Sequence, residues 1–420
     1  MISVPEAYLF LNPVWGEVYL ERFLKFSLPA QLCAGNMQAM PRDRSRYLIF
    51  THERHFAAIR QSDAFRRLEE LVPASLLSLD DLPDPRTNPN PHELQTAAYN
   101  RGLRFGRGKN AAFILLQPDI LLADGAFARL VELCERQGKH VVTIASIRMC
   151  VEGTLECLDD YRSGTPGEIA IPARALVRHC IGDLHPISAA HIVTERGVRA
   201  AQHHYWPVGK DGFLIHAFHL SPLLVWPTEP NTTIRGTLDE DYVGRACPDR
   251  TGWYTATDTD EICQVEFSTR EHKNHIFSEH YFSDACLQQF MYLSTNEAHR
   301  EMFRTPFRFH ASPVEPAAWA PVEARAAEYA AKLLAKFENA HGQPATVEAT
   351  PTSIAAPGKS LIRRAFAPLR YGYRKLAAPL YNYLDRMNAE IIGLRAEIDL
   401  LRVGQQHLRE KLSGSERKAA

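Results

Sequence analysis

The sequence predicts an α/β protein with a mostly parallel sheet covered by helices, followed by a helical C-terminal tail. Apolar runs typical of strands alternate with segments of helical periodicity over residues 1–145, and this alternation is typical of a parallel sheet covered on both faces. In residues 380–412, apolar residues recur at alternating spacings of four and three, which is typical of a coiled coil. The two patterns separate a globular body from a tail.

The expected elements of the body follow one another in a regular order. Each expected strand is a short apolar run, and each expected helix repeats its apolar residues every three or four positions. Because ligands of parallel sheets bind beyond the carboxyl ends of the strands, the loops after these strands are the expected position of a site. The expected strands are 7–16, which breaks into a loop at its end, 47–51, 76–79, 111–116 and 140–145. The expected helices are 17–28, 56–71, 92–105 and 125–136.

Residues 150–310 alternate less regularly. Their clearest expected strand is the apolar window 212–226, which two histidines and a proline interrupt. This window is shorter than the ~18 apolar residues of a membrane-spanning helix. A helix is expected in residues 313–340, where Ala, Glu, Lys and Leu are frequent, so the globular domain is assigned to residues 1–312.

Composition and charge narrow the class of protein. Lys and Arg total 48, and Asp and Glu total 49, so the overall charge predicts no nucleic-acid partner. The eight cysteines include no CxxC pair and are expected to be reduced thiols. The N-terminus lacks the basic region of a signal peptide, so a cytoplasmic protein is expected.

The most informative stretch is residues 97–127. It contains the sequence AAYNRG, two further glycines, the apolar run AAFILL and the sequence QPD, and the next expected helix begins soon after. This stretch resembles the centre of family 2-like glycosyltransferases of the GT-A fold, in which a helix bearing A-x-N-x-G precedes an apolar strand that ends at a D-x-D or D-D. The resemblance implies a GT-A-like (Rossmann-like) fold for residues 1–312.

The same resemblance implies an activity. These enzymes move a sugar from a nucleotide-sugar donor to an acceptor, here expected to be a glycan or glycolipid, and inversion at the sugar carbon is expected. The motif Q/R-x-x-R-W is missing, which argues against a processive, polymer-making role. The alternatives are a catalytically inactive GT-A-like interaction module and a nucleotidyltransferase, although the Gly-rich phosphate loop of the latter is missing near residues 10–20.

Asp119 is the first expected metal ligand. It follows the apolar strand 111–116, but Gln117 stands where D-x-D has its first carboxylate. A Mn²⁺ or Mg²⁺ ion held by one or two carboxylates and by phosphate oxygens would neutralise the charge on a departing diphosphate. The resemblance implies His219 as a further ligand, because many GT-A enzymes use a histidine in this way. The structural alternatives are a turn at Asp119 and a core histidine at His219.

Six residues are expected to contact the nucleotide. The loop after the first strand can place Trp15 against the base and lets the backbone approach closely at Gly16, while core packing is the alternative for Trp15. Glu53, in the loop after the second strand, is expected at the ribose or as a base. Asn100 and Arg101 lie on the helix before the sequence QPD. The full set is Asn12, Trp15, Gly16, Glu53, Asn100 and Arg101.

The expected catalytic base lies in the acidic segment Asp239, Glu240 and Asp241. An inverting transferase needs a base to take the proton of the acceptor hydroxyl, and the resemblance places such a carboxylate at about this distance beyond the metal motif. A solvated acidic loop and a set of metal ligands are the alternatives. Asp258 and Asp260 form a further D-x-D, in a polar loop.

The tail divides into three segments. Residues 341–358 have the Pro, Thr, Ala and Gly content of a flexible linker. Residues 359–379 are basic and amphipathic, with six Lys or Arg and no acid in 359–375, and are expected to lie on the anionic inner face of a membrane, with docking on the body as the alternative. Residues 380–412 are expected to form a coiled coil that joins copies of the chain in a homo-oligomer.

Overall fold

The structure is a computed structural model that describes most of the chain before the tail. Apart from His280, the described residues belong to one compact unit, Met1–Lys273 with Tyr281–Gln343. The predicted linker beyond its first residue, the basic segment 359–379 and the coiled coil 380–412 lie outside the described residues. The described ranges are 4–82, 91–272 and 280–341.

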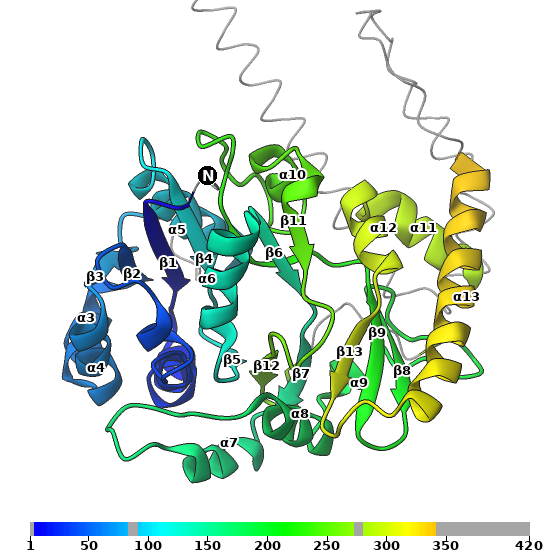
Figure 1. The fold of residues 1–420 in the computed structure, drawn as a ribbon, viewed down its shortest axis with the longest axis horizontal. Coiled ribbons are helices and arrows are strands. Elements are labelled where there is room, and N and C mark those ends of the chain that lie inside the picture. The colour runs from blue at the N-terminus through cyan, green and yellow to red at the C-terminus, as the bar shows by residue number, and fades with distance from the viewer. Residues whose placement is uncertain (1–3, 83–90, 273–279, 342–420) are drawn as a thin grey trace, which may run out of the picture. The chain divides into compact units, whose positions relative to one another are not determined.

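A seven-stranded, mostly parallel sheet forms the centre of the body (Figure 1). Its strands are β1 Ala7–Pro13, β2 Ser45–Thr51, β3 Ala74–Ser78, β4 Ala111–Leu115, β6 Val141–Ile144, β10 Ser221–Val225 and β11 Trp253–Thr255. The strand order is β11-β6-β10-β4-β1-β2-β3. Strands β1 to β4 are parallel, and β10 lies antiparallel between β4 and β6. The predicted α/β class and mostly parallel sheet are therefore confirmed.

Helices cover both faces of this sheet, because alternate residues of each strand point to opposite sides. On one face, α4 (Asp63–Leu71) and α6 (Ala126–Gln137) bury one apolar cluster. On the other face, α5 (Pro91–Phe105) and α10 (Tyr242–Ala246) bury a second. This two-sided burial explains why the strands read as nearly continuous apolar runs.

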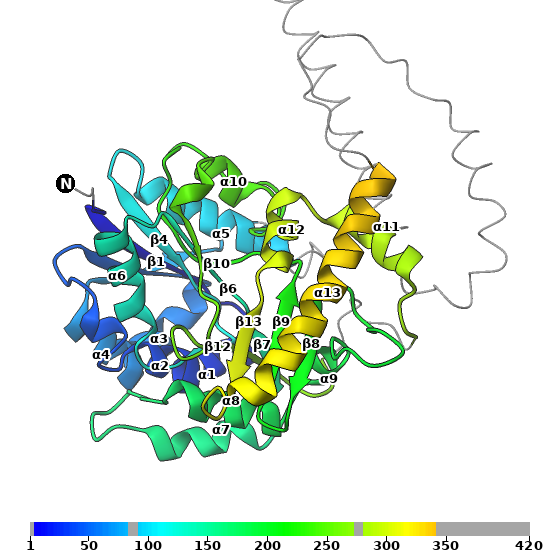
Figure 2. The ribbon, with the colours of Figure 1, turned by 45° about the vertical axis from the view of Figure 1, so that its right-hand side comes forward.

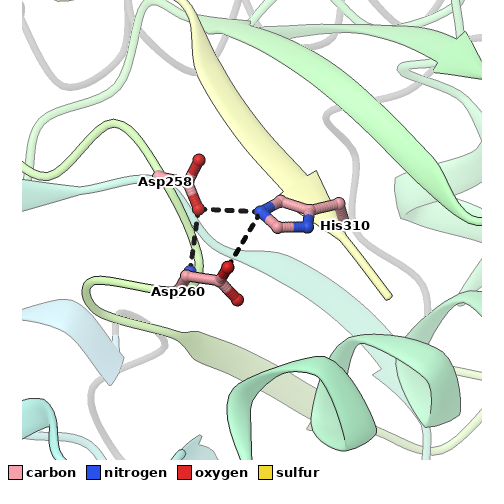
Figure 3. A group of neighbouring side chains, drawn as sticks. All are labelled: Asp258, Asp260 and His310. Carbon is pink, nitrogen blue, oxygen red and sulfur yellow. Dashed lines mark hydrogen bonds and ion pairs between the residues drawn. The ribbon is translucent and has the colours of Figure 1, made fainter. Parts of the chain in front are cut away.

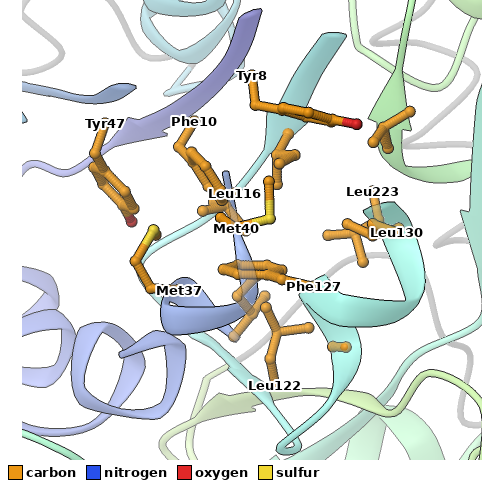
Figure 4. Close-up of a cluster of buried hydrophobic side chains, with 14 of the residues drawn as sticks. Tyr8, Phe10, Met37, Met40, Tyr47, Leu116, Leu122, Phe127, Leu130 and Leu223 are labelled. Atoms are coloured by element: carbon orange, nitrogen blue, oxygen red, sulfur yellow. The ribbon is translucent and has the colours of Figure 1, made fainter. Parts of the chain in front are cut away.

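The first apolar cluster is built around β1. The ring of Phe10 stacks on Tyr47 with centroids 5.5 Å apart and meets Phe127 of α6 at 5.1 Å (Figure 4). Full burial of one such side chain stabilises the fold by about 1.5–3 kcal/mol relative to exposure. These contacts fix β1, β2 and α6 relative to one another, and with them the loops that follow the strands.

Two predicted helices are divided. The predicted helix 56–71 breaks at Ser62, whose hydroxyl accepts a hydrogen bond from the backbone N–H of Phe65 and so begins α4 after α3 (Phe56–Gln61). The predicted helix 17–28 is a series of three pieces. These are α1 Glu17–Arg22, a π-helical turn Phe23–Ser27 and α2 Leu28–Gln31.

The prediction of one strand over 212–226 is wrong. The segment forms β9 (Gly212–Ala217) and β10, which belong to different sheets. Between them the ring of Phe218 stacks on Phe303 with centroids 3.7 Å apart, so the chain leaves one sheet and enters the next around this contact. The break places His219 where the two sheets meet.

Two three-stranded sheets complete the body. Their strands are β5 Ile120–Leu122, β7 Ile147–Cys150, β8 His203–Val208, β9, β12 Gln264–Ser268 and β13 Phe307–His310. One sheet has the order β5-β12-β7 and the other β13-β9-β8. The remaining helices are α7 Thr154–Cys157, α8 Ala173–Gly182, α9 Pro186–Ala189, α11 Asp284–Ser294, α12 Glu297–Arg304 and α13 Pro316–His341. Helix α13 lies along β8 and β9 (Figure 2) and occupies the segment in which a helix was expected.

Two other expectations concern thiols and membrane spans. All eight cysteines are free thiols, as the sequence predicts. Within the described residues, no helix combines the length and the apolar character needed to span a bilayer.

Candidate functional site

The candidate site lies at the end of β4, along the edge where β1, β2 and β3 also end, since these strands are parallel. Asp119 follows β4 and leads directly into β5. The neighbour of β5 is β12, which carries Glu266 opposite Ile120. On the other side of β12, β7 carries Arg148 opposite Glu266. The sheet β5-β12-β7 therefore brings charged side chains from distant segments to the end of β4.

Asp119 is a half-buried carboxylate. Burial raises its pKa to about 6, because loss of hydration destabilises the ionised form, while the guanidinium of Arg148 acts in the opposite direction. Glu266 adds a like charge, and Arg22 of α1 a weaker opposite one. A carboxylate in this environment is stabilised when a cation binds it.

Arg148 and Glu266 form an ion pair across neighbouring strands. The backbone N–H of Arg148 donates a hydrogen bond to Ser188 at 2.9 Å. Burial alone would raise the pKa of Glu266, but Arg148 and His219 outweigh it and lower that pKa. Burial would likewise lower the pKa of Arg148, but Glu266 and Asp119 raise it. Both groups therefore stay ionised, and Arg148 places a fixed positive charge near Asp119.

His219 and Asp239 form a second pair, in which Nδ1 of His219 lies 2.9 Å from a carboxylate oxygen. The other oxygen of Asp239 accepts a hydrogen bond from the Thr237 hydroxyl at 2.6 Å. Burial alone would lower the pKa of His219, but Asp239 raises it; the same contact keeps the pKa of Asp239 well below its usual range, although burial opposes this. Because Nδ1 is engaged and the His219 side chain is 33% exposed, Nε2 is the nitrogen available to a ligand.

The other two acids of the predicted base segment are placed differently. Asp241 is exposed and pairs with Arg245 through both carboxylate oxygens, at 2.8 and 2.9 Å. Glu240 is also exposed, and its backbone oxygen accepts a hydrogen bond from Asn296 at 2.6 Å. Of the three acids, the structure brings Asp239 to the histidine.

Three further histidines surround this pair. The ring of His203 lies 5.8 Å from that of His219, and the ring of His191 lies 4.9 Å from that of His203. His299, in the first turn of α12, is an electrostatic neighbour of Asp239. Burial lowers the pKa of His191 and of His299 to about 4. Their rings are neutral near pH 7, so a proton that enters this group is held best by His219.

The end of β1 and the loop after it hold three of the residues expected at the nucleotide. Asn12 is buried, with its amide donating to the Tyr47 hydroxyl at 2.8 Å and its oxygen lacking a hydrogen-bond partner. Trp15 is half-buried and packs against the apolar cluster beneath α5, which agrees with the core-packing alternative. Gly16 has φ 82°, a conformation that favours glycine. The end of β1 therefore keeps one unused acceptor, the side-chain oxygen of Asn12.

Glu53 follows β2, and the side chain of Arg101 contacts the loop after β3. The Glu53 side chain is exposed, and its backbone N–H donates to Asp80 at 3.1 Å. Arg101 reaches from α5 to the loop after β3, where it pairs with Asp81 at 2.6 Å. These contacts shape the edge of the sheet beside the loop after β1.

Asn100 and Gly102, from the AxNxG pattern of α5, have packing roles. Asn100 donates to the backbone oxygen of Ile234 at 2.9 Å and accepts from its N–H at 2.8 Å. A methyl group on Gly102 would lie 2.6 Å from the Leu11 side chain, so glycine lets α5 approach β1 closely. The pattern thereby fixes α5 against β1 and against the segment that leads to Asp239.

The predicted metal ligands are not part of a ready-made cluster. Within the described ranges, the only group with three potential ligand atoms within 4.8 Å of one another is Asp258, Asp260 and His310. Nδ1 of His219 is already engaged by a carboxylate. Asp119 alone fits Mn²⁺ or Mg²⁺ when phosphate oxygens and water complete the coordination, because these ions need only one or two protein carboxylates.

Arg148 and Glu266 were not identified from the sequence. Each is a charge between apolar neighbours in a strand, and a charge in a buried strand usually has a partner, so a signal was present. The sequence does not predict that His191, His203 and His299 lie near His219, because these residues come from segments far apart in the chain.

No protein-family model and no curated protein matches the chain. Solved structures similar to it include S. aureus TarS 1-349 in complex with UDP, at 11% identity and a TM-score of 0.25, over 35% of this chain and 37% of that chain. S. aureus TarS 1-349 matches at 9% identity and a TM-score of 0.32, over 88% of this chain and 74% of that chain. GalNAc-T7 with UDP, GalNAc and Mn2+ matches at 10% identity and a TM-score of 0.33, over 81% and 58%.

At these identities and TM-scores, the neighbours carry no argument about activity. The chain spans just over a third of the length of the first of these neighbours, at 37%. The function proposed below therefore rests on the side chains of this chain.

Proposed function

We propose that the protein is a glycosyltransferase that moves a sugar from a nucleotide-sugar donor to a hydroxyl group of a glycan or glycolipid, with inversion at the sugar carbon. The observation that carries the proposal is the series of neighbouring charges that runs from Asp119 through Arg148 and Glu266 to the pair His219–Asp239. One region thus combines groups suited to a diphosphate leaving group with a base suited to an acceptor hydroxyl.

On the donor side, Arg148 and Asp119 act on the diphosphate. As the sugar leaves, negative charge grows on the phosphate oxygens, and Arg148, held in place by Glu266, stabilises that charge without reorganisation. When bound at Asp119, Mn²⁺ or Mg²⁺ supplies further positive charge to the diphosphate. The base and ribose are proposed to extend along the sheet edge toward Trp15 and Glu53.

On the acceptor side, His219 is the proposed proton acceptor. The acceptor oxygen forms its bond to the sugar carbon while the bond from that carbon to the diphosphate breaks, and the hydroxyl proton passes to Nε2 of His219. Asp239 holds Nδ1 and stabilises the imidazolium that forms, as in other carboxylate–histidine pairs. Asp239, the residue expected as the base, is therefore proposed to orient His219.

The tail extends the proposal to location and assembly. Basic residues 359–375 would hold the enzyme at the anionic inner face of a membrane, where a glycolipid acceptor would be within reach. Residues 380–412 would join copies of the chain. This part of the proposal, like the cytoplasmic location, rests on the sequence pattern, since both segments lie outside the described residues.

A thermal-shift screen tests the proposed donor class. Nucleoside diphosphates and their sugars should raise the melting temperature, more so with Mn²⁺, because a ligand at 100-fold its Kd stabilises by about 2.7 kcal/mol. The matching nucleoside monophosphates, which lack the diphosphate, should give smaller shifts. If no nucleotide changes the melting temperature with or without metal, the alternative of a catalytically inactive interaction module is favoured.

A further inference from the structure

A second group of charged side chains joins the loop between β11 and β12 to the end of β13 (Figure 3). The loop supplies Asp258 and Asp260, and β13 supplies His310. Two hydrogen bonds fix the loop on the strand. The backbone N–H of Thr259 donates to the backbone oxygen of Arg308 at 3.0 Å, and the backbone N–H of His310 donates to the Thr259 hydroxyl at 3.2 Å. The three side chains are thus held before any ligand arrives.

The hydrogen bonds of His310 define which ring nitrogen can bind an ion. Nδ1 lies 2.7 Å from the backbone oxygen of Ser312, and a carbonyl accepts only, so Nδ1 carries hydrogen. Nε2 of the neutral ring then points a lone pair at the carboxylate oxygen of Asp258, 2.8 Å away. Two acceptors at this distance require a cation between or beside them, either a proton or a metal ion. A histidine ligand oriented by a backbone carbonyl is usual in metal sites.

Asp260 is oriented in a similar way. Arg174 of α8 donates to both of its carboxylate oxygens, at 2.9 and 2.6 Å. The guanidinium offsets one of the two carboxylate charges, so the group has a net charge of −1 while the His310 ring is neutral, counting Asp258 and Asp260 against Arg174. A divalent cation is therefore attracted to the group in spite of Arg174.

The spacing of the three ligand atoms suits a small ion. Nε2 of His310 lies 2.8 Å from Asp258 and 3.9 Å from Asp260. Ligands about 2.0–2.2 Å from a tetrahedral ion are about 3.3–3.6 Å from one another, so shifts of about half an ångström would complete the geometry. His310 is buried, whereas the side chains of Asp258 and Asp260 are 28% and 44% exposed, which leaves an open side for a water ligand.

We propose that Asp258, Asp260 and His310 form a binding site for a divalent first-row transition ion, with Zn²⁺ as the best match, separate from the nucleotide site at Asp119. One imidazole and two carboxylates are a ligand set for Zn²⁺ or Mn²⁺, whereas Mg²⁺ and Ca²⁺ prefer oxygen ligands alone. The bound ion ties the loop after β11 to the end of β13 and so stabilises the junction of two sheets.

Calorimetric titration of the full chain with Zn²⁺, after removal of metals with a chelator, tests the site. Wild-type protein should bind one equivalent at this site and melt at a higher temperature with Zn²⁺, and Mg²⁺ should give no such binding. Asp258→Asn keeps the shape of the side chain but removes a ligand charge, so Zn²⁺ affinity at this site should fall at least tenfold. Asp260→Asn should have the same effect and provides a second variant if Asp258→Asn folds poorly.

Asp159→Asn is the matched control, because Asp159 is also an exposed aspartate paired with an arginine, at 2.7 Å, but lies outside the group. This control and Asp119→Asn should both retain the Zn²⁺ affinity of the wild type. The test of the Zn²⁺ site is therefore independent of whether the protein is a transferase. The proposal is overturned if the wild type binds no Zn²⁺, or if Asp258→Asn and Asp260→Asn, both folded, bind it as the wild type does.

Discussion

At Asp239 the carboxylate is a weaker base than an ordinary aspartate. Burial would make it more basic, but His219 and the Thr237 hydroxyl stabilise its ionised form and hold its pKa well below the usual range. The imidazole of His219 has the opposite shift, because ionised Asp239 raises its pKa. The imidazole is therefore the member of the pair that gains and releases the proton.

Replacement of either member of this pair should reduce turnover and leave donor binding intact. His219→Gln removes the proton acceptor, and Asp239→Asn removes the carboxylate that orients it, so kcat should fall about 10²–10⁴-fold in each. The Kd for the nucleotide sugar should change little, because the pair acts on the acceptor. Steady-state kinetics combined with calorimetric binding of the donor would measure both quantities.

The matched control for this prediction is Asp241→Asn. Asp241 carries the same charge two residues away but is exposed and paired with Arg245, so its loss should leave kcat within about twofold, as for surface pairs worth about 0–1 kcal/mol. A large loss of turnover in Asp241→Asn, with normal turnover in His219→Gln, would assign the base to Asp241 and remove His219 from that role.

At the scale of elements, α5 approaches β1 closely because Gly102 has no side chain. A Cβ there would lie 2.6 Å from Leu11, whereas Gly244 of α10 has open space around it. Both glycines lie in helices, so alanine has the same backbone preference at each. The difference between the two positions is therefore one of packing.

Gly102→Ala should destabilise the protein by up to about 2 kcal/mol, because the cost of overpacking is about 1–3 kcal/mol and the gain in helix propensity is about 1 kcal/mol. Gly244→Ala should instead stabilise it by about 0.4–1 kcal/mol, since alanine reduces the entropy of the unfolded chain. Urea unfolding of both variants would test this. If both substitutions change the free energy of unfolding equally and in the same direction, the close contact between α5 and β1 does not determine the effect at Gly102.

The elements differ in how well the sequence predicts them. Local apolar runs predict strands β1 to β4, and Asp119 is an expected metal ligand because it follows the last of them. The pairing of Arg148 with Glu266 depends on the register of β7 against β12, which joins segments far apart in the chain. The division of 212–226 depends on the packing of Phe218 on Phe303. The local apolar pattern therefore predicts where the strands end, whereas contacts between segments far apart in the chain determine which side chains pair.

The whole molecule contains several histidines that are buried in the neutral form. Burial lowers the pKa of His191 and His299 to about 4 and that of His204 to about 3. In the unfolded chain these rings titrate near pH ~6.5, so as pH falls below that value the unfolded chain takes up protons first. Their contribution to stability is complete above pH ~6.5 and is lost progressively as pH falls toward ~4.

Stability should therefore fall steeply between pH 6.5 and 4, with a loss at pH 5 of about 2 kcal/mol for each such histidine. His204→Leu should reduce this acid loss, because His204 lies among the rings of Phe218, Phe303 and Tyr329 and a leucine there does not titrate. Urea midpoints of wild type and variant from pH 7 to pH 4 would measure the difference. If wild type and variant lose the same stability between pH 7 and pH 4, His204 is not one of the histidines that cause the acid loss of stability.

The assembly of the whole chain is predicted from the sequence of its tail. If residues 380–412 form a coiled coil, the full chain should be a homo-oligomer, and a truncation ending at Ala340 should be a monomer, because the apolar stripe of the helix would be buried between copies. Light scattering of both proteins at micromolar concentration would decide. If both proteins are monomers, the coiled-coil prediction is wrong. If both are oligomers, the contact between copies lies in the body.

Asp119 and its neighbours are proposed to bind a nucleoside diphosphate together with a divalent cation. Asp119→Asn provides a direct test, because it removes one charge from a desolvated position and keeps the shape of the side chain, so the fold should be retained. Calorimetric titration would use the nucleoside diphosphate with the largest thermal shift, with and without Mn²⁺, on wild type and variant. We predict that Mn²⁺ strengthens binding at least tenfold in the wild type and has no effect in Asp119→Asn. Equal, Mn²⁺-dependent binding by both proteins would contradict the account.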